Sequence, residues 1–216
     1  MNSSEPYFPW RPHLWHGLSA GRDPPRMVHA YVEITPYDAM KYEIDKTTGY
    51  LRMDRPQTSS SLPPTLYGFI PRTYCATRVA RLSSRADRGD GDPLDICVIT
   101  ERPIARAEVP VSAKVVGVLK TLDEGLADDK ILVVLDNDPF WGGVKDVAEM
   151  PEVVTFRLRH YFSTYKMTPV KPDAVEVVGL YGVEEALAVV SASLDDYADA
   201  YGSVRSLALN VSERDG

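Results

Sequence analysis

The sequence has little cysteine, no long apolar run and a deficit of positive charge. Cys75 and Cys97 are the only cysteines in 216 residues, too few for a disulfide framework, and we expect both to be reduced thiols. No run approaches the roughly 18 apolar residues that a membrane span requires. Residues 1–26 also lack the apolar segment of a secretory signal. The sequence therefore predicts a cytoplasmic protein without a membrane partner.

The net charge of −7 argues against a nucleic-acid partner, because proteins that bind a phosphate backbone cluster Lys and Arg. An acidic protein can still bind a small polyanion when metal ions bridge the two. The length and the 44% share of apolar residues fit one sizeable soluble domain.

Proline and aromatic residues dominate residues 1–26, which predicts an extended arm lying on the body of the protein. Regular structure is expected from Met27 onward, so that 27–216 form one domain. Alternating apolar residues predict a strand near 27–35, and residues 40–54 predict a hairpin in which Gly49 supplies a positive φ. Loops are expected at 56–64 and, as a longer basic connection, at 73–88.

Further strands are expected at 94–99, 111–119, 130–135 and 174–180. Apolar residues at helical spacing predict helices over Val154–Tyr165 and Leu187–Tyr201. Strands come first and helices after, which favours one α+β domain, a small barrel with flanking α-helices.

The first chemical signal is an acidic turn that contains Asp90, Asp92 and Asp95, with Gly91 and Pro93 between them. Carboxylates this close repel each other unless cations neutralise them. Hard oxygen ligands at this density suit Mg²⁺ or Ca²⁺ rather than zinc or copper. A solvated turn is the alternative, because Asp, Gly and Pro also dominate turns for backbone reasons.

A second acidic turn contains Asp123 and Asp128 and is followed by Lys130. Both turns lie at the mouth of an expected strand. If the two are adjacent in space, five carboxylates surround one cavity, and such a cavity requires metal ions to offset the repulsion.

Seven motifs in order resemble the soluble family I inorganic pyrophosphatases. Asp90-Gly91-Asp92-Pro93-Leu94-Asp95 fits the family's Asp-x-Asp-Pro-x-Asp signature. The supporting matches are Lys41 to Lys46, Asp54-Arg55, Tyr67-Gly68, Val116 to Leu119, Asp123 to Lys130, and His160 to Lys166. The resemblance covers roughly Met27 to Tyr181. It implies a five-stranded OB-like barrel and a catalytic pyrophosphatase domain over residues 27–216.

The resemblance also implies the site. Mg²⁺-dependent hydrolysis of pyrophosphate to two phosphates would use a metal-activated water, with Asp92 as the general base; Mn²⁺ is a possible substitute. The residues that match metal ligands are Asp90, Asp95, Asp123, Asp128 and Glu43. The residues that match phosphate contacts are Lys41, Arg55, Tyr67, Lys130, Tyr165 and Lys166. Glu33 resembles an acidic residue lining the same cavity, and the family implies a homo-oligomer, hexamer or dimer.

Several residues also have a simpler interpretation. Lys41 and Glu43 could form an exposed strand face, Tyr165 could belong to the helix core, and Arg55 could form an ion pair at a hairpin end. Loose transition states of phosphoryl transfer nevertheless require the cations and paired metals that this set would supply.

Three rival functions follow from the same residues. An EF-hand frame that starts at Asp90 puts Asp95 where the Ca²⁺ loop requires Gly. A binding module of the oligonucleotide-binding type would need a basic groove, which the net charge disfavours. A pseudoenzyme of the same fold would lack at least one metal ligand, and none of the proposed metal ligands is missing from the sequence.

The sequence departs from the family pattern at three places. Pro63 stands where many bacterial members carry a tyrosine, so that one contact is in doubt. The connection from Tyr67 to Asp90 is long, and the arm is extra to the core. These additions leave the choice between hexamer and dimer open.

Overall fold

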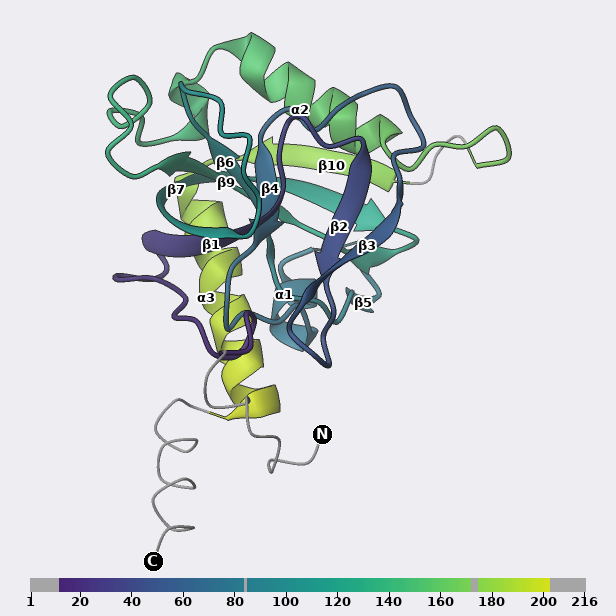
Figure 1. Ribbon diagram of the computed structural model, residues 1–216. Coiled ribbons are helices and arrows are strands. Elements are labelled where there is room, and N and C mark those ends of the chain that lie inside the picture. The colour runs from purple at the N-terminus through teal and green to yellow at the C-terminus, as the bar shows by residue number, and fades with distance from the viewer. Residues whose placement is uncertain (1–11, 84, 172–174, 203–216) are drawn as a thin grey trace, which may run out of the picture.

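The computed structural model describes residues 12–83, 85–171 and 175–202. Strands and helices alternate irregularly along the chain (Figure 1). The strands are β1 (Met27–Ile34), β2 (Met40–Ile44), β3 (Leu51–Pro56), β4 (Leu66–Phe69), β5 (Arg88–Gly89), β6 (Asp95–Ile99), β7 (Val109–Asp123), β8 (Leu126–Ala127), β9 (Lys130–Leu135) and β10 (Val175–Tyr181). The helices are α1 (Thr77–Arg81), a 3₁₀ turn (Val147–Glu149), α2 (Glu152–Thr164) and α3 (Val183–Tyr201).

Five strands close into a ring. β1 pairs with β4, β4 with β6, β6 with β9, β9 with β7, and β7 returns to β1. Only the β6–β9 pair of this ring is parallel. The short β5 and β8 extend the sheet beyond β7, and β10 also pairs with β7. The predicted five-stranded OB-like barrel within an α+β fold is therefore confirmed.

Alternate residues of the ring strands pack into two cores. In β9, Ile131 and Val133 join a cluster with α3, whereas Leu132 and Val134 join a second cluster with α2. Because side chains alternate across a strand, strands buried on both faces become apolar throughout. Figure 1 shows α2 and α3 on different sides of the sheet. No helix within the described ranges is both long and apolar enough to cross a bilayer.

Most elements lie where the sequence pattern predicts them. β9 spans the expected residues 130–135, α2 and α3 cover the predicted helices, and β2 and β3 form the hairpin. β10 begins at Val175, and the expected first residue of that strand, Ala174, lies outside the described residues.

The connection at residues 73–88 contains regular structure that the sequence pattern did not predict. This segment is not a plain connection, because it contains the one-turn helix α1 and leads into β5. α1 has too few residues for an apolar period to reveal it, and tertiary contacts stabilise it instead.

The described part of the arm packs on the body of the protein through aromatic rings. Trp15 is 2% exposed and donates its indole N–H to the Thr73 carbonyl at 2.8 Å. His16 stacks beside it and shares a 2.7 Å hydrogen bond with the hydroxyl of Tyr197 on α3. Residues 1–11 of the expected arm lie outside the described residues.

We expect Gly68→Ala to destabilise the barrel severely. A Cβ at position 68 would lie 1.8 Å from the Tyr31 carbonyl oxygen, so β4 could no longer pair closely with β1. The free energy of unfolding in urea should fall by at least about 3 kcal/mol. Gly143→Ala is the control, because a Cβ there meets nothing within 4 Å. Equal stability of the two variants would contradict this account of the strand pairing.

Candidate active site

The acidic turns and the hairpin enclose one cavity of about 510 Å³. The Asp90–Asp95 loop forms one wall, the β7–β8 turn forms another, and the β2–β3 hairpin lies across from them. Its lining includes most of the predicted site residues, namely Glu33, Lys41, Glu43, Tyr67, Asp90, Asp92, Asp95, Asp123, Asp128, Tyr165 and Lys166. The fold thus brings together residues from Glu33 to Lys166 in the sequence.

Lys130 joins the two acidic turns. Asp95 begins β6 and Lys130 begins β9, and the two residues are direct partners in the parallel pair. The Lys130 Nζ atom lies 2.5 Å from Asp95 Oδ2 and forms a second ion pair with Asp128. Lys130 is 1% exposed. Burial alone would lower its pKa, but the Asp128 and Asp95 carboxylates outweigh burial and raise the Lys130 pKa well above its usual range.

Three carboxyls in the cavity hold their protons more tightly than usual. Burial, then repulsion from Asp128 and Asp95, raises the pKa of Asp90 to about 8. Burial, then repulsion from Asp95, raises the pKa of Glu33 to about 8, although Glu33 accepts a 2.7 Å hydrogen bond from the Ile44 N–H. Burial also raises the Asp128 pKa. The cavity therefore contains more negative charge than its own cations neutralise.

Asp92 differs from its acidic neighbours because it faces solvent. Its side chain is 45% exposed and forms an ion pair with Lys46 from the hairpin turn across the cavity. Its backbone N–H donates to Asp90 Oδ1 at 3.0 Å, which orients the loop. The Asp92 side chain is therefore partly open to solvent, although its Oδ1 atom is buried.

Two further pairs place cations at the rim. Lys166, just after α2, lies 2.5 Å from Asp123 Oδ2. Lys41 contacts Glu43 at 2.8 Å and Asp54 at 3.1 Å. The exposed-face alternative for Lys41 and Glu43 does not hold, since both line the cavity.

Two tyrosines complete the floor. Tyr67 donates its hydroxyl proton to Asp95. Tyr165 is 7% exposed, packs in the α2 core and also reaches the cavity. Tyr165 therefore lies both in the helix core and at the cavity, and its role in binding phosphate stays a prediction.

Arg55 and Lys130 do not belong to the cavity lining. Arg55 lies 3.7 Å from Asp54 itself, whereas the hairpin-end alternative expected an ion pair with residues next to Asp54. Its Nη1 atom is buried and, within the described ranges, has no hydrogen-bond acceptor. A buried donor without a partner is costly, so this atom can bind an added oxygen ligand. Pro63 is buried and does not line the cavity.

Sequence reasoning assigned no role to Lys46 or Arg52, although both line the cavity. Lys46 contacts Asp92, and Arg52 donates to Glu43 at 2.6 Å. The sequence did contain a signal for both residues. Lys46 ends the Lys41–Lys46 motif, and Arg52 lies opposite Glu43 in the predicted hairpin.

No three acidic, His or Cys side chains of the described residues converge tightly enough to enclose one cation in this arrangement. Lys130 pairs with both Asp95 and Asp128 and so supplies positive charge where those carboxylates meet.

The chain is similar to known proteins over most of its length. The family model described as "Inorganic pyrophosphatase" matches residues 30–198. The inorganic pyrophosphatase of Chlamydia trachomatis serovar L2 is 42% identical over 88% of this chain and 95% of its own length. Soluble inorganic pyrophosphatase 2 of Chlamydomonas reinhardtii is 36% identical over 88% of this chain and 90% of its own.

Solved structures show the same likeness. The inorganic pyrophosphatase of Thermus thermophilus superposes with a TM-score of 0.73 at 32% identity, covering 86% of this chain and 98% of that one. The type I enzyme of Toxoplasma gondii gives a TM-score of 0.76 at 26% identity over 88% of each chain. Sequence, fold and cavity agree, and this chain belongs to the inorganic pyrophosphatase family.

Proposed function

We propose that this chain hydrolyses inorganic pyrophosphate to two phosphates, that Mg²⁺ is its activating metal and that Asp92 is the general base. The observation that carries this proposal is the meeting of two acidic turns with lysines and tyrosines around one cavity of about 510 Å³. Family membership supports the activity, and the residue roles follow from the geometry and the resemblance together.

The donor set fits hard divalent cations. Every proposed ligand is a carboxylate, the chemistry that Mg²⁺ and Mn²⁺ prefer. The proposed ligands are Asp90, Asp95, Asp123, Asp128 and Glu43. The raised pKa of Asp90, caused by burial and then by Asp128 and Asp95, supports the assignment because a bound divalent cation would offset both the burial and the repulsion. Bound there, Mg²⁺ would offset phosphate charge and lower the pKa of the attacking water.

The cationic side chains suit the substrate. Phosphoryl transfer passes through a loose transition state, so catalysis depends on positioning and charge neutralisation. We assign Lys41, Lys130 and Lys166 to the phosphate oxygens as point charges. Arg55 offers a planar fork that can donate two parallel hydrogen bonds, and its unpartnered buried Nη1 atom supports this role. Tyr67 and Tyr165 would donate to the same oxygens.

Asp92 suits the role of base because its carboxylate faces the cavity and is accessible. As the water oxygen bonds to one phosphorus, Asp92 accepts the water proton. The bond from that phosphorus to the bridging oxygen breaks, and the electron pair leaves with the second phosphate. Lys46 lies beside Asp92, and their ion pair would hold the carboxylate in place.

Domain organisation and assembly belong to the same proposal. Residues 27–216 would form one catalytic domain, with 1–26 as an arm. A homo-oligomer, hexamer or dimer, is supported by the exposed apolar residues Val153 (52%) and Phe156 (62%) on one face of α2. Mass measurement in solution tests the assembly.

The activity is tested by phosphate release from pyrophosphate. We expect turnover at millimolar Mg²⁺ and a loss of at least about a thousandfold in EDTA, because without metal the crowded carboxylates repel the substrate and no metal lowers the pKa of the attacking water. Mn²⁺ should restore part of the rate. Absence of turnover at every Mg²⁺ concentration would refute the proposed function, and tight binding of single-stranded nucleic acid instead would favour a binding module.

We expect Asp92→Asn to lower kcat by about 10²–10⁴-fold at neutral pH, the usual contribution of a general base. The amide has nearly the same shape but is a far weaker proton acceptor. Mg²⁺ binding, measured by calorimetry, should change little. Asp87→Asn serves as the control, because Asp87 is exposed and absent from the cavity lining. A fully active Asp92→Asn variant would move the role of base to another residue.

The raised pKa of Asp90 predicts how metal-free stability depends on pH. Its carboxyl titrates near 8 in the fold, because of burial and then Asp128, against an ordinary value of 3.8. Between these values the folded state holds a proton that the unfolded chain has released, so stability falls as pH rises through this window. In EDTA, Asp90→Asn should reduce the loss of unfolding free energy between about pH 5 and 8 by on the order of 2 kcal/mol. Urea unfolding at both pH values checks this, and equal losses in wild type and variant would contradict it.

A further inference from the structure

The backbone of one residue, Cys75, forms two hydrogen bonds to the Asp90–Asp92 loop. The Gly91 N–H donates to the Cys75 carbonyl at 3.0 Å, and the Cys75 N–H donates to the Asp92 carbonyl at 2.8 Å. Gly89 runs so close that a Cβ there would lie 2.2 Å from the same Cys75 oxygen. A displacement of Cys75 would therefore displace the loop.

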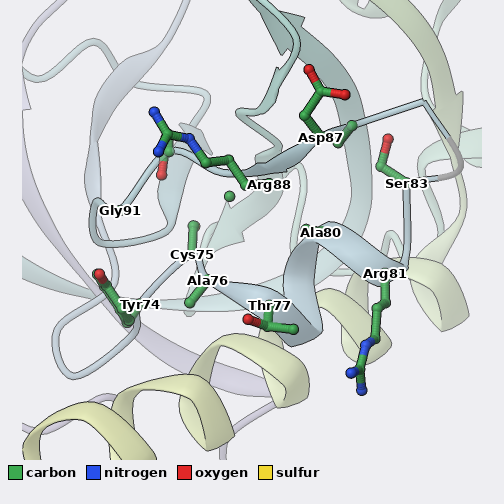
Figure 2. A pocket seen from close by; sticks show the side chains of 13 residues that line it. Tyr74, Cys75, Ala76, Thr77, Ala80, Arg81, Ser83, Asp87, Arg88 and Gly91 are labelled. Atoms are coloured by element: carbon green, nitrogen blue, oxygen red, sulfur yellow. The ribbon is translucent and has the colours of Figure 1, made fainter.

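Few side chains pack against the loop on the side that faces α1. A cavity of about 560 Å³ lies between α1 and residues Arg88–Gly91 (Figure 2). Figure 2 shows Cys75 and Ala76 on the segment that leads into α1, with Gly91 on the loop beyond them. Because open space replaces packed side chains here, backbone hydrogen bonds position the loop. The two bonds of Cys75 act together with the 2.9 Å bond from the Leu94 N–H to Thr73 Oγ1 and with the pairing of β5 and β8.

The segment that carries Cys75 is not anchored by its own helix. α1 has only five residues, and its N-cap residue, Ala76, offers no side-chain cap. A helix this short is not stable alone, and its first N–H groups need acceptors.

α3 supplies those acceptors. Asp196, 4% exposed, accepts from the N–H groups of Ala76 at 3.1 Å, Arg78 at 3.0 Å and Val79 at 3.2 Å. The Ser193 carbonyl of α3 adds a bond from the Tyr74 N–H at 3.0 Å. A buried carboxylate at a helix start forms charge-assisted hydrogen bonds and a favourable dipole interaction. The Asp196 side chain thus fixes the residues that follow Cys75, and the Ser193 carbonyl fixes the residue that precedes it.

We propose that Asp196 is a positioning residue for the active site: acting through α1 and Cys75, it holds the Asp90–Asp92 loop in the arrangement that binds metal and presents the base. This inference rests on the proposed function, because it takes Asp90 as a metal ligand. Asp196 does not touch the cavity; its effect passes through three N–H groups and the backbone of Cys75.

Asp196→Asn tests this role, because it keeps the shape and one acceptor but removes the charge. We expect Mg²⁺ to bind the metal-free variant about tenfold more weakly by calorimetry, the loss of roughly one charge-assisted hydrogen bond. The Mg²⁺ concentration for half-maximal activity should rise equally, while kcat at saturating Mg²⁺ stays within about twofold. Amide exchange at Cys75 and Gly91 should quicken, with Ile96 and Val98 in β6 unchanged.

Asp199→Asn is the matched control. Asp199 pairs with the same Arg78 guanidinium but is 64% exposed, and it accepts no backbone N–H from α1 in the hydrogen bonds of the described residues. We expect its Mg²⁺ affinity and its exchange at Gly91 to match the wild type.

A folded Asp196→Asn variant with wild-type Mg²⁺ affinity and unchanged exchange at Gly91 would overturn the inference. If that variant does not fold, Arg78→Ala, which removes a guanidinium 3.4 Å from Asp196 Oδ1, decides the question: a two- to threefold weaker Mg²⁺ affinity is expected, and an unchanged one refutes the role. The calorimetric and exchange readouts do not require turnover. An inactive wild type would therefore refute the proposed function separately.

Discussion

Repulsion between buried carboxylates is the constraint on which this site depends. Asp90, Asp95 and Asp128 share one cavity floor, and burial with mutual repulsion raises the pKa of Asp90 and Asp128. Lys130 offsets part of this charge from a position that is 1% exposed. Charge concentrated in this way costs stability and is useful only where cations and a polyanionic substrate complete it.

The barrel generates this crowding through its strand pairing. The parallel pairing of β6 and β9 places Asp95 directly beside Lys130. Asp128, two residues before Lys130, contacts the same ammonium group. Closing the ring requires β4 to approach β1 closely, which glycine at position 68 allows. The register that closes the barrel is therefore also the register that assembles the acidic floor.

Parts of the chain outside the two acidic turns determine where the cavity walls lie. The hairpin brings Lys46 to Asp92, and α3 fixes α1 through Asp196. The arm adds a contact at the same place, since the Trp15 indole N–H donates to the carbonyl of Thr73, two residues before Cys75. Loops that perform chemistry are commonly held by a rigid scaffold, and here the scaffold includes both ends of the described chain.

The sequence by itself determined the elements whose signal is local. Alternation predicted β1, helical spacing predicted α2 and α3, and the density of Asp near Gly91 predicted an acidic loop, because such patterns depend only on neighbouring residues. Tertiary structure alone decided the rest. The ion pair of Lys130 with Asp95, the pairing of Lys46 with Asp92 and the capping of α1 by Asp196 join residues far apart in the chain. No local period encodes such contacts, because they follow from how the strands close and from which buried groups must find partners.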